Sequence, residues 1–218
     1  MTTPLRTRNV RPSVAGPLFW RVLHWSTLVA PRSRETAVLW TCIVDAMGCP
    51  ACRSHFCEVL AHRSITRNTE LTAMHGVLLH GDVNTRLGRV PFPAGTLVTQ
   101  TEVLQRRFCA GLMYLCPREL ASLLLMIAMG AEREGDNPAR ERGTALFVNA
   151  LITLVCQSSK TTDGGAWRQL GANCLRLPPA QGGKKSLFLH IERLFHNVPG
   201  VQIARLTEQL NACAFAEQ

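Results

Sequence analysis

Two cysteines separated by two residues, Cys49 and Cys52 in the stretch GCPACRSHF, are the residues of this chain best suited to chemistry. A pair at this spacing can bind a metal, fix a loop, or exchange electrons as a dithiol and a disulfide. The sequence after Cys52 has a helical pattern, which places the pair at a helix N-terminus, where backbone N–H groups and the dipole stabilise a thiolate. Arg53 and His55 add to that positive environment. The setting predicts a lowered thiol pKa and favours a redox role, because thiol–disulfide exchange requires a thiolate.

Structural zinc is the first alternative for the CxxC. Cys57 and His55 lie close to the pair in sequence, but a tetrahedral zinc site usually joins two separated pairs of ligands. The later close pair, Cys109 and Cys116, has the wrong spacing for a zinc knuckle. We therefore expect no metal among the site residues.

A thioredoxin-like domain is the second alternative. The stretch VLWTCIVDAMGCPACR reads as strand, loop and helix, and Pro91 follows some 40 residues later, where such folds place a cis-proline. That fold requires strands on both sides of the dithiol. The flanking sequence instead has helical spacing with few alternating β-branched runs, which favours helices.

Helices are predicted along most of the chain. Ser33 is a plausible N-cap, and Pro50 suits the first turn of a helix that starts within CPAC. The apolar periodicity predicts helices at 18–29, 34–47, from CPAC to Arg63, at 70–88, 100–116, 118–130, 139–157, 185–196 and 199–213. We expect an all-α protein with a basic flexible tail at 1–15, a bundle of four or five helices at 16–98, and a helical C-terminal region at 99–218.

Composition excludes some functions. The chain has 218 residues and a formal net charge of +9, but the charge is spread evenly, at +3 in each of the three expected regions. Even spreading and a single tyrosine argue against a specific nucleic-acid surface. The longest apolar stretches, 120–131 and 145–156, are about 12 residues long, short of the roughly 20 that span a membrane. We therefore expect no membrane span. No apolar segment follows Met1, so we expect no secretory signal and leave the compartment open.

Two further stretches flank the CxxC. GPLFWRVLH (16–24) has the pattern G-x3-W-x2-L-H, and HGDVNTRLGR (80–89) has the pattern H-x2-V-N-x2-L-G-basic. With the CxxC between them in this order, they resemble the Erv/ALR family of FAD-linked sulfhydryl oxidases. The resemblance covers residues 16–93, under half of the chain.

The resemblance implies a helical bundle that binds FAD without a covalent bond. Cys52 would lie next to the flavin ring, and Cys49 would exchange electrons with the thiols of protein substrates. Molecular oxygen would be the final acceptor and hydrogen peroxide the product. The FAD would be bound by residues of the two flanking motifs: Trp20, His24, His80, Val83, Asn84, Arg86 and Arg89. The arginines suit its diphosphate.

The chain departs from the family pattern at several positions. Gly81 stands where the family usually has asparagine, and Met47-Gly48 where an aromatic residue and proline usually precede the CxxC. The family also implies pairing of two bundles, as a homodimer or as an internal pseudo-dimer in which residues 99–218 are a degenerate second copy. A non-enzymatic helical interaction protein with a structural CxxC is the remaining alternative.

Overall fold

Ten α-helices make up the part of the chain that this computed structural model describes, which contains no strand. It comprises residues 11–89, 96–110, 115–131, 136–159, 165–173 and 182–213. The helices are α1 (Pro12–Val29), α2 (Arg34–Ala46), α3 (Pro50–His62), α4 (Ala73–Arg86), α5 (Thr96–Cys109), α6 (Pro117–Gly130), α7 (Pro138–Ser159), α8 (Gly165–Ala172), α9 (Lys184–Leu194) and α10 (Ile203–Cys213). The all-α prediction is confirmed.

Helix starts that depend on local capping fall where the sequence predicts them. The Ser33 hydroxyl accepts a hydrogen bond from the backbone N–H of Thr36 at 3.1 Å, which caps α2. Proline occupies the first position of α3, directly after Cys49, because a proline there loses no helical hydrogen bond. The predicted N-terminus within CPAC is confirmed.

Several helix boundaries differ from the prediction; α10, for example, begins at Ile203 and not at residue 199. α1 begins at Pro12, so residues 12–15 of the expected tail are helical; residues 1–10 lie outside the described residues. The helix predicted at 100–116 ends at Cys109, and Cys116 instead caps α6, its sulfur accepting from the Glu119 N–H at 3.4 Å. The sequence pattern also missed α8, which is only eight residues long.

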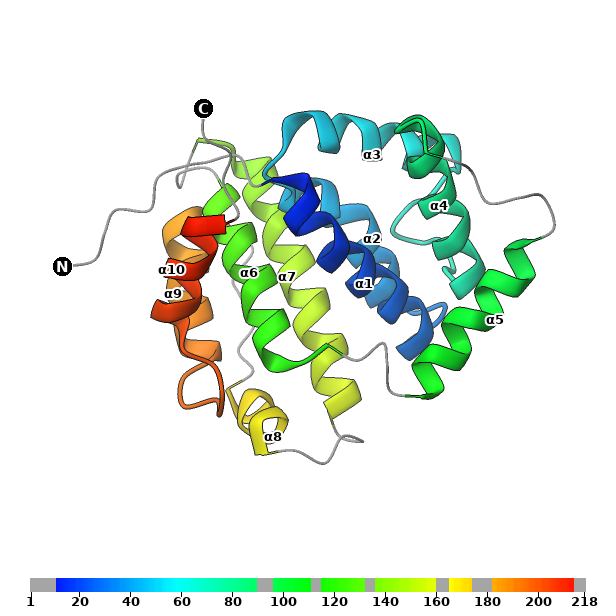
Figure 1. Ribbon diagram of the computed structural model, residues 1–218. Helices are drawn as coiled ribbons and strands as arrows, with labels where there is room; N and C mark the ends of the chain where they lie inside the picture. The colour runs from blue at the N-terminus through cyan, green and yellow to red at the C-terminus, as the bar shows by residue number, and fades with distance from the viewer. Residues whose placement is uncertain are drawn as a thin grey trace.

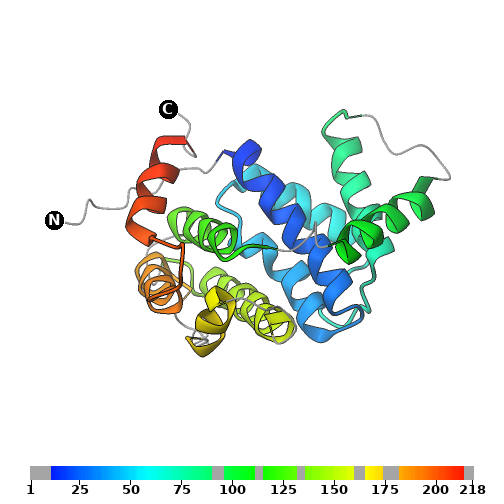
Figure 2. The same ribbon diagram turned by 60° about the horizontal axis from the view of Figure 1, so that its bottom comes forward.

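The helices are arranged around α1, α2, α6 and α7. α2 and α7 form the most extensive helix–helix contact of the described residues. α4 and α5 lie at one end of the molecule, and α9 and α10 lie at the opposite end (Figures 1 and 2). α3 crosses beside the first residues of α1, between the end of α2 and α4 (Figure 1). The residues just before the CxxC lie against α6 and α7, which belong to the C-terminal half of the chain.

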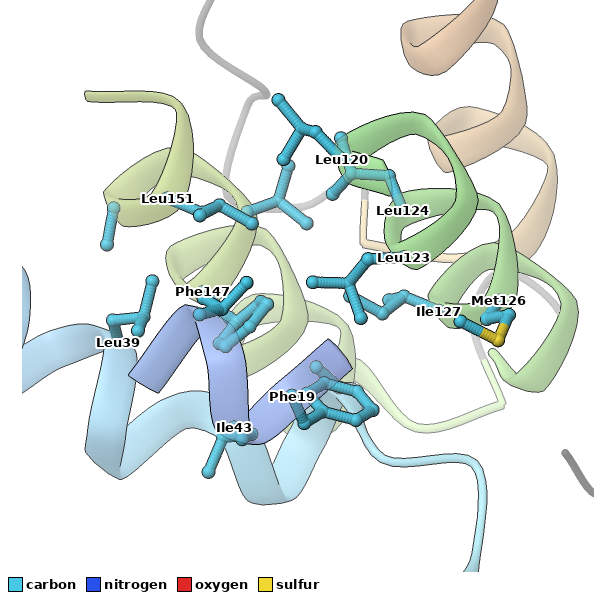
Figure 3. Packing of buried hydrophobic residues seen from close by; sticks show 14 of the residues in the cluster. Phe19, Leu39, Ile43, Leu120, Leu123, Leu124, Met126, Ile127, Phe147 and Leu151 are labelled. Atoms are coloured by element: carbon cyan, nitrogen blue, oxygen red, sulfur yellow. The ribbon is translucent and has the colours of Figure 1, made fainter. Parts of the chain in front are cut away.

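One continuous core joins the two halves. Figure 3 shows side chains from α1, α2, α6 and α7 converging on a shared interior. Phe19 of α1 meets Phe147 of α7 edge to face, with ring centroids 6.1 Å apart, a geometry that aromatic pairs favour. Leu39 and Ile43 of α2 are fully buried in the same cluster as Leu123 of α6.

Within the described residues, no helix combines the length and the apolar character needed to cross a bilayer.

Candidate functional site

The CxxC lies at the N-terminus of α3. Cys49 is the N-cap, and its Sγ accepts a hydrogen bond from the backbone N–H of Cys52 at 3.2 Å. Both cysteines are half-buried and both are free thiols. The first N–H groups of a helix point out of its N-terminal end and carry its positive dipole. The sulfur of Cys49 therefore takes the place that a capping oxygen occupies in most helices.

The pKa of Cys52 is raised, whereas a lowered thiol pKa was predicted. Burial is the largest cause, followed by a hydrogen bond with Cys49 and the negative charge of that neighbouring sulfur, and together they raise the pKa to about 12. Two thiols this close cannot readily ionise together, because the first thiolate keeps the proton on the second. Cys52 therefore keeps its proton at neutral pH, which leaves Cys49 as the candidate nucleophile of the pair.

His55 does not contribute the positive charge expected of it. Burial, and then the nearby charge of Arg86, lower its pKa below the usual 6.5, although Glu58 opposes this. Its imidazole is therefore mostly neutral at pH 7. Its Nε2 is buried without a hydrogen-bond partner among the described residues.

The two flanking motifs meet in an aromatic cluster. The indole of Trp20 on α1 stacks on the imidazole of His80 on α4, with ring centroids 3.9 Å apart and 9° between the planes. His24, one turn after Trp20, has its Nε2 3.0 Å from Nδ1 of His80. A histidine pair at this distance shares one proton between two neutral rings. Three residues predicted at one site are therefore in direct contact.

Burial keeps both histidines neutral. It lowers the pKa of His24 to about 3, with a further contribution from His80, and lowers that of His80 to about 4, with a further contribution from Arg89. His24 is 7% exposed, and its Nδ1 lies against α4. A Cβ at Gly76 would lie 3.0 Å from that nitrogen, so α1 and α4 approach closely only because position 76 is glycine.

Phe56 and Trp40 connect this cluster to the dithiol. The ring of Phe56 lies 6.0 Å from that of Trp20 and 6.5 Å from that of Trp40. Phe56 is four residues after Cys52 on α3, so the two share a helix face. Neither aromatic residue was among the site residues predicted from the sequence, although the i, i+4 spacing from Cys52 could have indicated Phe56.

The remaining predicted residues lie on or after the last turns of α4. Val83 is buried, Asn84 is half-buried, and Arg86 and Arg89 are exposed. Arg86 forms an ion pair with Glu58 of α3. The charge of Arg89 acts on the ring of His80. All the predicted residues thus lie on α1, on α3, or on α4 and the residues after it.

The residues of this cluster are of the kinds that bind a ligand with flat rings and a diphosphate. Trp20 is half-buried, whereas Trp40 and Phe56 are buried behind it. The unpartnered Nε2 of His55 is a polar atom that a ligand could satisfy. Arg86 and Arg89 supply positive charge beside them. Trp20 and His80 are in contact, so no ring lies between those two, and a ligand must use other faces of the cluster.

The alternatives fare differently. A thioredoxin-like domain is contradicted, because helices α2 and α3 flank the CxxC and the described residues contain no strand, whereas that fold requires strands on both sides of the dithiol. For zinc, no group of three or more His, Cys, Asp or Glu side chains in the described ranges could hold a metal ion. Cys109 and Cys116 are free and exposed, and Cys156 on α7 is disulfide-bonded.

No protein-family model matches the chain, and no curated protein or solved structure is significantly similar to it. The resemblance to Erv/ALR proteins therefore depends on the three sequence motifs alone.

Proposed function

We propose that this protein is a FAD-dependent sulfhydryl oxidase that forms disulfide bonds in protein substrates, with Cys49 and Cys52 as its redox pair. One observation carries the proposal. Trp20 and His24 contact His80, although His24 and His80 are 56 residues apart in sequence, and Phe56 extends this cluster toward Cys52. These contacts bring residues of the two motifs that flank the CxxC into one cluster, which supports a shared site.

The chain's own residues account for the thiol chemistry. In the oxidised pair, a substrate thiolate attacks the sulfur of Cys49 and releases that of Cys52, which takes up a proton. The second substrate thiol, losing its proton, then attacks the mixed disulfide and leaves with the first as a disulfide. Cys49 and Cys52 are then both reduced, as in this structure. Because its pKa is raised, the Cys52 sulfur takes up a proton once it is released.

The aromatic cluster would hold the cofactor beside Cys52. FAD, when bound, supplies the chemistry that removes two electrons from the dithiol and delivers them to oxygen, giving hydrogen peroxide. Trp20 and His24 would line the cofactor from α1, with His80, Val83 and Asn84 on the adenosine side. Arg86 would need to exchange its ion pair with Glu58 to bind the diphosphate. Protein substrates and a pairing of two bundles stay predictions.

Purified protein tests the proposal. We expect a yellow protein with flavin absorbance near about 450 nm, since the cofactor carries the electrons. We also expect oxygen uptake that depends on added dithiothreitol. Cys52→Ser should abolish that uptake while flavin stays bound, whereas Cys57→Ser, at an exposed thiol of the same helix, should leave it unchanged.

Two results would overturn the proposal. Undiminished uptake in Cys52→Ser would refute the role of that sulfur. A colourless protein that neither binds added FAD nor consumes oxygen with thiols would favour the helical interaction protein with a structural CxxC.

A further inference from the structure

The segment before the CxxC is attached to the C-terminal half of the chain. Arg140 of α7 donates from Nε to the carbonyl oxygen of Asp45 at 3.1 Å, and from Nη2 to that of Met47 at 2.8 Å. Thr144, one turn along α7, donates its hydroxyl to the same Asp45 oxygen at 2.9 Å. The two carbonyls lie four and two residues before Cys49. Three hydrogen bonds from one helix therefore fix the backbone that leads into the redox pair.

These carbonyls need partners because α2 ends there. The last four carbonyl groups of a helix have no N–H partner within it. After α2 ends at Ala46, Met47 is extended, with φ −75° and ψ 123°, and the chain turns toward α3. The guanidinium of Arg140 offers donors in a rigid planar fork, so it fixes the two carbonyls relative to each other. A lysine has a single, freely rotating ammonium group and would bind only one of them well.

The other side of the turn is covered by the end of α6. A Cβ on Gly48 would lie 3.0 Å from the Cα of Gly130, the last residue of that helix. On α7, a Cβ on Gly143 would overlap the carboxylate of Asp45. The turn between α2 and α3 is thus held between two helices of the C-terminal half. Gly48 permits close approach to the backbone of α6, and Gly143 leaves room for the side chain of Asp45.

We propose that Arg140 is a positioning residue for the Cys49–Cys52 pair, and that the C-terminal half of the chain sets the redox equilibrium of the dithiol by holding the turn from which Cys49 projects. The role of Arg140 in catalysis rests on the proposed function. The redox equilibrium of the dithiol can be measured without flavin or turnover.

The direction of the effect follows from preorganisation. A disulfide forms only when the two sulfurs meet in a narrow geometry. A fixed turn raises the effective concentration of one sulfur at the other, and a loosened turn lowers it. Removal of the two hydrogen bonds of Arg140 frees the backbone before Cys49 but leaves Cys52, inside α3, in place. The disulfide should therefore form less readily, and the pair should become more oxidising.

The experiment measures the dithiol–disulfide equilibrium of the full chain in glutathione buffers without oxygen. One oxidised glutathione takes two electrons from the pair, which gives the protein disulfide and two reduced glutathiones. Acid quenching, alkylation of free thiols and mass spectrometry then give the oxidised fraction at Cys49 and Cys52. We expect Arg140→Ala to lower the equilibrium constant for disulfide formation by about tenfold, and Arg140→Lys to lower it less.

Two variants complete the test. Arg142→Ala removes an exposed arginine two residues along α7 and should leave the constant unchanged. Thr144→Val keeps the side-chain shape but loses one hydrogen bond, so it should lower the constant by about two- to threefold, and it serves if Arg140→Ala does not fold. The inference would be overturned if the equilibrium constant were unchanged in Arg140→Ala or fully retained in Arg140→Lys. It would also be overturned if the constant fell equally in Arg142→Ala. If Arg140→Ala does not fold, an unchanged constant in Thr144→Val would overturn it. None of these outcomes depends on flavin binding, so failure here is distinct from failure of the oxidase.

Discussion

The indole of Trp20 and the imidazole of His80 lie parallel and in contact, with 3.9 Å between ring centroids. Trp20 comes from the first described helix, and His80 comes from the fourth. Their contact, together with the His24–His80 hydrogen bond, holds α1 and α4 against each other beside the candidate site. Substitution of these residues should therefore affect the stability of the fold.

His80→Ala should lower the free energy of unfolding by about 1–3 kcal/mol, because it removes the stack and leaves the buried Nε2 of His24 without its partner. Urea denaturation of the two proteins measures this difference. His62→Ala, at an exposed histidine of α3, is the matched control and should change the value little. Equal losses in the two variants would contradict the structural role of His80.

Stability should fall in acid because the histidine pair stays neutral in the folded protein. Below about pH 6.5 the unfolded chain binds a proton at His24 and at His80, whereas the folded protein does so only near pH 3 and pH 4. The stability present above pH 6.5 is thus lost as the pH falls toward those values. His24 alone should contribute a slope of about 1.4 kcal/mol per pH unit in that window, and the more exposed His80 less.

Urea denaturation at several pH values between about 4.5 and 7 checks this slope. His24→Gln, which cannot titrate in this range, should reduce the slope by about 1.4 kcal/mol per pH unit, the contribution of one proton. The comparison between the two proteins cancels other groups, including Asp45, whose pKa burial raises and whose effect has the opposite sign. An identical slope in the variant would show that His24 is protonated in the folded state.

Cys49→Ala should lower the pKa of Cys52. Both the hydrogen bond that the Cys52 thiol donates to Cys49 and the charge of Cys49 disappear in this variant, but burial, the largest cause, remains. The pKa should therefore fall from about 12 yet stay above that of an exposed thiol. The pH dependence of alkylation at position 52, followed by mass spectrometry, gives the value.

Cys57→Ala is the control for that measurement and should leave the pKa of Cys52 unchanged. An equally high pKa after loss of Cys49 would mean that burial alone accounts for the shift. The two sulfurs would then titrate independently, contrary to their contact in the structure.

Local features explain what the sequence could predict. The N-cap at Ser33 and the Cys49-Pro50 start of α3 depend on a few neighbouring residues, so the pattern places both helices correctly. The first helix begins earlier than predicted because Pro12 is compatible with the first position of a helix. The motif at Trp20 and that at His80 could each be recognised, but not the stacking of the two rings.

The remaining features depend on long-range packing. The raised pKa of Cys52 follows from its burial and its distance to Cys49, and neither can be read from a helix N-terminus alone. The hydrogen bonds of Arg140 join residues 95 and 93 positions apart, in a region where no motif was found. Sequence patterns identify residues suited to chemistry, whereas their protonation and their supports depend on the folded chain.

Gly143→Ala should destabilise the contact between α2 and α7. Alanine usually favours a helix interior over glycine by about 1 kcal/mol, but here its Cβ would overlap the carboxylate of Asp45 and force that side chain to move. We expect a net loss of about 1–3 kcal/mol in the free energy of unfolding, measured by urea denaturation.

Gly165→Ala provides the matched control, because a Cβ there meets no atom within 4 Å among the described residues. That variant should change the free energy of unfolding by less than about 0.5 kcal/mol. In an Asp45→Ala background the clash is only partly relieved, because the Cβ of residue 45 would still lie 2.7 Å from the new methyl group. Gly143→Ala should therefore cost less there than in the parent, though not nothing. A cost that is the same in both backgrounds would show that the carboxylate of Asp45 does not lie against Gly143.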